Sequence, residues 1–135
     1  KGFATLAVDR QGAMCSAEIA CPLVQLRLPR RGAPAMHAVN HYQLPELEGM
    51  HRRTPEGLAN SLARSRLLEQ ECEAGNRSLE HLRRILRRHG QPALCRHGGA
   101  DQAWTEFSVI GLTARATLMV APGCPCTGEY VSVPL

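Results

Sequence analysis

The amino-acid sequence predicts an α+β fold built from antiparallel sheets, and three observations support that prediction. Short segments with alternating or β-forming residues, separated by turn residues, fill the first 40 positions and recur after residue 103. Two segments with helix-capping residues lie between them. The length of 135 residues and the 44% hydrophobic and 21% charged fractions are ordinary for a folded globular chain.

The first 40 residues predict a meander of four strands. Gly12 can supply the positive φ of a tight turn after the first strand, and residues 29–34 are rich in proline and glycine. Strands joined by such short turns pair antiparallel and bury one face of their sheet. The expected strands are Phe3–Val8, Ala13–Ala20, Leu23–Leu28 and Ala35–Asn40.

A first helix is expected after a loop. Thr54 is placed to cap it, Pro55 suits its first position, and Gly75 follows its expected end at Glu73. This helix needs an apolar surface to pack against. The first sheet is the natural partner.

A second helix is expected to begin after Asn76 or Ser78 and to end at Gly90. Its apolar stripe faces away from an arginine-rich back, and we expect the stripe to pack on the same sheet. The stripe consists of Leu79, Leu82, Ile85 and Leu86.

The remaining residues return to β structure. A hairpin is expected from Trp104–Thr113 and Arg115–Val120, followed by a rigid loop over Pro122–Cys126 and a last strand over Gly128–Val133. The sequence contains no internal repeat and no shift in composition. We therefore expect residues 1–135 to form a single domain or the C-terminal portion of a larger hydrolase domain.

Composition and charge exclude several classes of protein. No apolar run approaches the roughly 18 residues of a membrane helix, and the start of the chain has no secretory pattern. The six cysteines are therefore expected to be reduced thiols in a cytoplasmic protein. The net charge of +4 is modest, so we do not expect nucleic acid as a partner.

Asn40-His41-Tyr42 is the first candidate for chemistry, because it lies where a predicted strand runs into a long loop. An Asn amide donates hydrogen bonds without carrying charge, as an oxyanion requires. From composition alone, an Asn that bonds its own turn is the commoner case.

A zinc site is a second candidate. Cys95 and His97, with Cys124 and Cys126, could offer three sulfurs and one nitrogen. Two to four residues lie between the paired ligands of familiar zinc sites, whereas only one lies between the members of each pair here. We therefore expect no metal. His81 and His89 are interpreted as structural residues of the second helix.

No nucleophile is recognisable within the chain. Cys15, Cys21 and Cys72 have no base beside them in sequence. The chain contains no Gly-x-Ser-x-Gly elbow, phosphate loop or dinucleotide fingerprint, so no cofactor is expected.

Several segments, taken in order, resemble the C-terminal part of the isopenicillin-N acyltransferase-like cysteine peptidases and acyltransferases. These enzymes belong with the choloylglycine-hydrolase-like N-terminal-nucleophile hydrolases. The resemblance covers nearly the whole chain and depends on the order and spacing of its parts. The segments are residues 9–12 with 16–19, 38–42, 61–68, 85–89, 94–97, 105–110, 120–126 and Tyr130.

The resemblance implies an αββα sandwich and a precursor that cleaves itself to expose a nucleophilic Cys. The thiol attacks an amide or thioester, its own α-amino group is the base, and an acyl-enzyme forms. Asn40 matches the family's oxyanion donor. Arg64 or Arg66 lies where relatives keep arginines, and Arg66 is our second catalytic candidate. Cys95 and Cys126 match family cysteines interpreted as packing residues.

The family's Gly-Cys-Thr-like junction is absent from this chain, since Pro125 precedes Cys126-Thr127 and Lys1 is no nucleophile of this type. The resemblance thus implies the C-terminal portion of an amide hydrolase or acyltransferase, inactive without an N-terminal half that carries the Cys. Its substrate would be a small-molecule amide or thioester. A polyanion-binding module using the Arg83–Arg88 helix, or a degenerate structural relative, are the alternatives.

Overall fold

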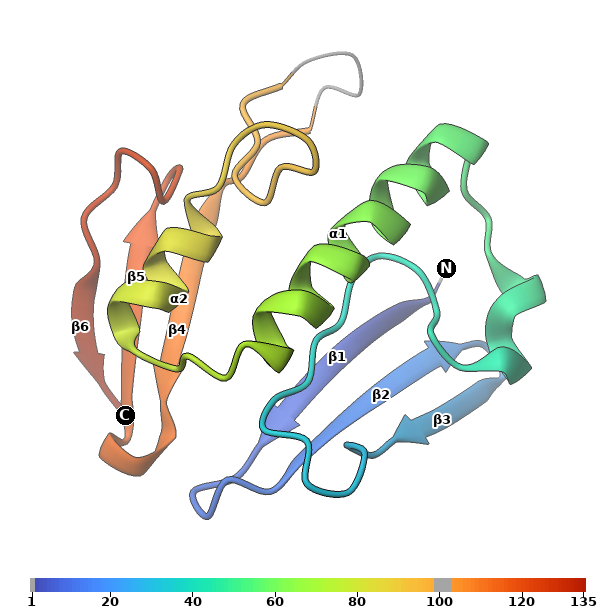
Figure 1. Ribbon diagram of the computed structural model, residues 1–135, viewed down its shortest axis with the longest axis horizontal. Helices are drawn as coiled ribbons and strands as arrows, with labels where there is room; N and C mark the ends of the chain where they lie inside the picture. The colour runs from blue at the N-terminus through green and yellow to red at the C-terminus, as the bar shows by residue number, and fades with distance from the viewer. Residues whose placement is uncertain (1, 99–102) are drawn as a thin grey trace. The chain divides into compact units, whose positions relative to one another are not determined.

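The computed structural model describes residues 2–98 and 103–135 and shows an α+β chain with antiparallel sheets. The elements follow the expected order, with three strands, two α-helices and three strands (Figure 1). The chain divides into two compact units, which we call unit 1 (Lys1–Gly75) and unit 2 (Asn76–Leu135). Each unit contains one sheet and one α-helix.

The sheet of unit 1 consists of β1 (Phe3–Val8), β2 (Met14–Ala20) and β3 (Leu23–Arg27), in the order β1-β2-β3. All pairs are antiparallel. Gly12 turns the chain between β1 and β2 with φ of 88°. The first three predicted strands are therefore confirmed, to within one residue at their ends.

The fourth predicted strand, Ala35–Asn40, is wrong, since these residues have no strand structure. Two of its carbonyl groups accept hydrogen bonds from arginine side chains instead of from a neighbouring strand. Arg27 Nη2 donates to the carbonyl of His37, and Arg53 Nε donates to that of Asn40. These two arginines bind the backbone along an irregular path.

The two faces of this sheet differ. On β2, Ser16, Glu18 and Ala20 are buried. Successive side chains of a strand point to opposite faces, so Ile19 lies on the other face, between its partners Phe3 and Val24. Phe3 and Val24 are each about 60% exposed. The face that holds Ser16 and Glu18 is thus buried along β2, although Leu6 and Leu23 beside it are exposed. The opposite face is apolar and exposed.

A 3₁₀ helix (η1, Pro45–Met50) precedes α1 (Pro55–Glu73). The Thr54 side chain accepts a hydrogen bond from the Gly57 amide, and Pro55 is the first helical residue. Gly75 follows the end with φ of 71°. The predicted cap, start and end of this helix are confirmed.

Helix α2 (Leu79–Leu86) has the predicted Ser78 cap, whose side chain accepts from the His81 amide. It ends before the predicted terminus, because Arg87 already closes the last turn and Gly90 lies in the following loop. The helix was expected to pack on the first sheet. By its contacts it belongs to unit 2, together with the second sheet.

The sheet of unit 2 consists of β4 (Phe107–Leu112), β5 (Thr117–Pro122) and β6 (Val131–Pro134), again antiparallel and in chain order. A short 3₁₀ turn (η2, Thr113–Arg115) joins β4 to β5, which confirms the predicted hairpin. The last strand begins three residues later than predicted.

The second sheet also has one exposed apolar face. Ser108 and Ile110 of β4 are buried, whereas Val109 between them is 43% exposed. Val109 pairs with Val120, which pairs with the exposed Val131. Among residues 2–98 and 103–135, no helix has the length and apolar character needed to cross a membrane.

Candidate functional site

Asn40 lies on the wall of an open pocket in unit 1 with a volume of about 970 Å³. The start of β1, the end of β2 and the loop before α1 form the other walls. Its lining includes Gly2, Phe3, Cys21, Tyr42, His51 and Arg53. The first sequence-predicted residue is therefore exposed at a concave surface large enough for a small molecule.

The amide of Asn40 has a defined orientation. Arg64 Nη2 lies 2.8 Å from Asn40 Oδ1. A guanidinium can only donate hydrogen bonds, so the atom that faces it is the carbonyl oxygen of the amide. The Asn40 Nδ2 group then points its two N–H donors away from Arg64. Arg64 is itself held by a hydrogen bond from Nε to Asn60 Oδ1, one turn earlier on α1.

His41 and Tyr42 point into the protein and support this loop. His41 is buried, and its Nδ1 lies 2.9 Å from Ser61 Oγ on α1. Burial, together with the nearby His51, lowers the pKa of His41 below its usual value. The Tyr42 hydroxyl donates to the Ile19 carbonyl of β2, and its ring stacks on His51 at 5.2 Å.

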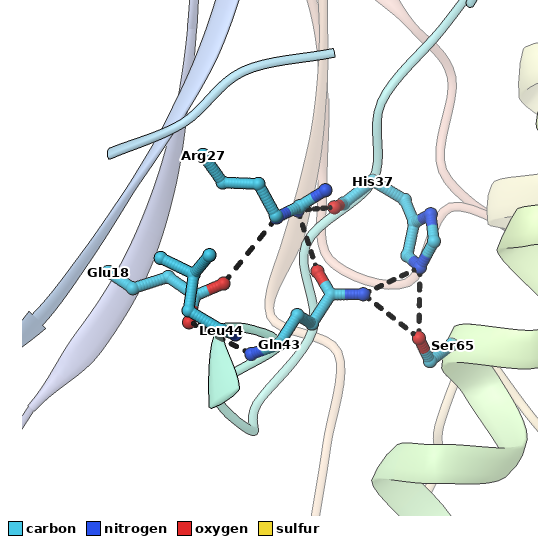
Figure 2. Close-up of polar contacts among 6 residues, drawn as sticks. All are labelled: Glu18, Arg27, His37, Gln43, Leu44 and Ser65. Carbon is cyan, nitrogen blue, oxygen red and sulfur yellow. Dashed lines mark hydrogen bonds and ion pairs between the residues drawn. The ribbon is translucent and has the colours of Figure 1, made fainter. Parts of the chain in front are cut away.

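A polar network attaches the same loop to the sheet (Figure 2). Glu18 of β2 is fully buried, and its Oε2 accepts hydrogen bonds from the Gln43 and Leu44 amides at 2.8 and 3.1 Å. Arg27 of β3 lies 3.6 Å from Glu18 Oε1. A buried carboxylate is tolerated because these donors and this cation face it.

The network continues to α1 through Gln43 (Figure 2). Arg27 Nη2 donates to Gln43 Oε1, so the Gln43 Nε2 group faces His37 Nε2 and Ser65 Oγ. Because Gln43 Nε2 can only donate, His37 Nε2 must accept, which requires a neutral imidazole. Burial and the charge of Arg27 accordingly lower the pKa of His37. Residues 37–44 are thus bonded to both the sheet and α1.

Arg66 is exposed on α1, and the described part of the chain shows no hydrogen bond or ion pair for it. Residues two apart on a helix point to different sides. Arg64 therefore contacts Asn40, and Arg66 does not. Cys21, weighed above as a nucleophile, lines the same pocket and is exposed.

In unit 2, three of the four zinc-ligand candidates, Cys95, His97 and Cys126, lie together with His89. The thiol and imidazole groups of His89, Cys95, His97 and Cys126 offer ligand atoms that all lie within 4.8 Å of one another. Burial raises the pKa of the Cys95 thiol to about 11. Cys124 is not part of this group, because its Sγ faces His97 Nδ1 at 3.4 Å. His89 was interpreted as a structural residue, although its position six residues before Cys95 was visible in the sequence.

The arginines of the second helix mostly contact their own unit. Arg83 lies over the ring of Tyr130 at 5.2 Å, Arg84 Nη2 lies 2.8 Å from His81 Nδ1, and Arg87 Nε donates to the Pro125 carbonyl. These contacts restrict the orientation of the three guanidinium groups but leave their charge in place.

Comparisons with protein-family models, with curated proteins and with solved structures find no match to this chain.

Proposed function

We propose that this chain is the C-terminal portion of an N-terminal-nucleophile amide hydrolase or acyltransferase, with Asn40 as oxyanion donor. The observation that carries the proposal is the orientation of the Asn40 amide. Arg64 occupies its oxygen, and the two N–H donors remain for a ligand at the pocket. A neutral donor fixed before the reaction stabilises negative charge that develops on a carbonyl oxygen.

In this mechanism the substrate carbonyl is attacked by the thiolate of a Cys that the N-terminal half supplies. The carbonyl oxygen becomes an oxyanion, and Asn40 Nδ2 donates to it. The leaving amine or thiol departs as the acyl-enzyme forms, and water or an amine then accepts the acyl group. Arg64 is a positioning residue here, since it acts through the Asn40 amide.

The exposed sheet faces favour the αββα sandwich of such enzymes. Each sheet has one face whose central residues are buried and, opposite to it, an apolar face that includes Ile19 in unit 1 and Val120 in unit 2. Exposed apolar faces of this kind pack on a second sheet about 10 Å away. Each unit also contains one α-helix, as each half of such a sandwich would require.

The test is to purify the protein from its natural source and to determine the mass and N-terminal sequence of every chain present. The proposal predicts a chain that begins with Cys. It also predicts hydrolysis of acyl 4-nitroanilides or acyl thioesters that stops when this Cys is alkylated.

Cys21→Ser provides the matched control, because Cys21 is the thiol that lines the pocket. Activity should survive this substitution, since the nucleophile is supplied from outside residues 1–135. The absence of any chain that begins with Cys, or activity abolished by Cys21→Ser alone, would overturn the proposal.

A further inference from the structure

The Cys/His cluster of unit 2 consists of His89, Cys95, His97 and Cys126, and it has no role in the proposed acyl transfer. His89 follows α2, Cys95 and His97 lie in the next loop, and Cys126 lies in the loop between β5 and β6. Three separate segments thus bring four ligand atoms to one place.

The contacts around His97 Nε2 cannot all be hydrogen bonds. This atom lies 3.1 Å from His89 Nε2, 3.5 Å from Cys95 Sγ and 3.2 Å from Cys126 Sγ. An imidazole nitrogen has either one N–H or one lone pair, so it serves one such neighbour well. A cation placed among the four atoms would bind all of their lone pairs at once.

Three of the six separations among the ligand atoms are close to those around a tetrahedral ion, and all six lie within 4.8 Å. Zinc–sulfur bonds of about 2.3 Å and zinc–nitrogen bonds of about 2.0–2.1 Å give a tetrahedron with edges of about 3.3–3.8 Å. The three separations around His97 Nε2 range from 3.1 to 3.5 Å. Two thiolates and two imidazoles are ligands that favour zinc over magnesium or calcium.

Cys124 prepares His97 to be a ligand. Its Sγ lies 3.4 Å from His97 Nδ1 and 3.3 Å from the Thr105 carbonyl. The thiol can donate to that carbonyl and accept the Nδ1–H of His97. That tautomer leaves the lone pair on Nε2, directed at the cluster. Metal-binding histidines commonly have a partner of this kind on the second nitrogen.

Backbone and side-chain hydrogen bonds hold the three segments in place. The amides of Leu94 and Cys95 both donate to the Arg88 carbonyl, which fixes the first loop to the end of α2. Arg87 Nε donates to the Pro125 carbonyl at 2.7 Å, next to Cys126. Cys95 is buried, whereas His89 and His97 are exposed, so an ion can reach the cluster from solvent.

We propose that His89, Cys95, His97 and Cys126 form a tetrahedral site for one Zn²⁺ ion per chain. All four positions are filled by protein ligands, which is the arrangement of a structural site and not of a catalytic one. The ion would connect the end of α2 to the β5–β6 loop. This proposal is independent of the acyl-transfer function, because every ligand belongs to unit 2.

The experiment uses the intact protein, reduced and freed of metal, and titrates it with Co²⁺ and Zn²⁺. Cobalt should produce the strong visible absorption of a tetrahedral ion and a thiolate-to-metal band, saturating at one ion per chain. Zinc should displace it. X-ray absorption of the zinc form should show two sulfur neighbours at about 2.3 Å and two nitrogen neighbours at about 2.0–2.1 Å.

Variants separate the ligands from their neighbours. Cys126→Ser and His89→Asn should no longer retain metal through gel filtration. Cys124→Ser should retain it, because Cys124 is not a ligand and a serine hydroxyl can both accept from His97 Nδ1 and donate to the Thr105 carbonyl. Cys72→Ser, in unit 1, should also retain it.

Several results would overturn the proposal. One is that the reduced wild-type protein binds neither ion. Another is a coordination shell without two sulfurs. A third is an equal loss of metal in Cys124→Ser and Cys126→Ser. A Cys95–Cys126 disulfide whose reduction creates no metal site would also do so. The wild-type X-ray absorption decides the matter even if a variant fails to fold.

Discussion

The polar network of unit 1 and the Cys/His cluster of unit 2 are both built from loops, but they are completed in different ways. In unit 1, the Glu18 carboxylate accepts two backbone amides, and Arg27 orients Gln43, which orients His37. In unit 2, His97 Nε2 faces three neighbours with a single bonding position. In the first arrangement the protein itself supplies the counter-charge, since Glu18 Oε1 and Arg27 Nε form an ion pair without a hydrogen bond. In the second, we propose that a cation completes the cluster.

This difference predicts that the two units respond differently to chelation, and this is the largest effect we expect. Zinc that binds only folded protein stabilises it, and structural sites contribute strongly to folding. Removal of the ion should therefore lower the thermal midpoint of unit 2 and leave unit 1 unchanged.

Trp104 makes that measurement specific to unit 2. It is the single tryptophan of the chain, and its ring lies 6.3 Å from that of His97. Its fluorescence should report unfolding of unit 2 at a lower temperature after chelation, while amide exchange of α1 stays constant. If chelation destabilised both units, or neither, the claim that the ion stabilises unit 2 alone would be contradicted.

Glu18→Ala should produce the next largest effect, and in unit 1. The substitution leaves two backbone amides and the Arg27 guanidinium without their buried anion. We expect a loss of about 3 kcal/mol in the free energy of unfolding. Urea denaturation followed by far-ultraviolet circular dichroism measures it.

Glu46→Ala is the control, because Glu46 is exposed in η1 and should change stability by less than about 0.5 kcal/mol. Amide exchange at Gln43 and Leu44 should increase in Glu18→Ala alone. Equal stabilities for the two variants would show that the network contributes little to unit 1.

The helix caps offer a test with a smaller expected effect, and each unit has one capping residue of the same kind. Thr54 Oγ1 accepts from the Gly57 amide in unit 1, and Ser78 Oγ accepts from the His81 amide in unit 2. Replacement of either by Ala should cost about 1 kcal/mol. Because the units are compact separately, each loss should appear in amide exchange of its own helix only. An effect that spreads to the other unit would indicate that they unfold together.

Acid should destabilise unit 1 through His37 and His41, and this is the smallest effect. Burial lowers both pKa values, with contributions from Arg27 for His37 and from His51 for His41. The two histidines make their full contribution to stability at pH values above 6.5, which is the pKa of a histidine in the unfolded chain. It decreases as the pH falls from 6.5 toward the folded pKa values, since the unfolded chain then binds more protons.

The pH effect is measured by urea midpoints in unit 1 from above 6.5 down to about 5. His37→Gln combined with His41→Gln should flatten the dependence. An unchanged slope in this double variant would assign the acid sensitivity to other groups.

The sequence predicted most of the fold because its signals were local. Thr54 and Pro55 begin α1 where expected, and the turn at Gly12 is where the pattern places it. The strand predicted at Ala35–Asn40 failed because distant arginines bind its carbonyls. Such long-range hydrogen bonds leave no periodic trace in the sequence.

The sequence likewise indicated some residues of the candidate sites and missed others. Asn40 was identified by its motif, but the role of Arg64, and not Arg66, in orienting it depends on the path of the loop across α1. The zinc candidates were rejected on spacing. Spacing rules assume paired ligands, whereas this cluster takes one thiol from Cys124-Pro125-Cys126 and adds His89.

The acylation rate of Asn40→Ala tests the central claim most directly. The complete enzyme, with its N-terminal Cys, is mixed with an acyl thioester, and the acyl-enzyme is followed by intact mass. Asn76→Ala is the control, because its side chain accepts from the nearby Ser78 amide and is not among the described residues that line the pocket. We expect Asn40→Ala to acylate about 100- to 1,000-fold more slowly than the wild type, and Asn76→Ala to match the wild type. Equal rates for the two variants would contradict the assignment of Asn40 as oxyanion donor.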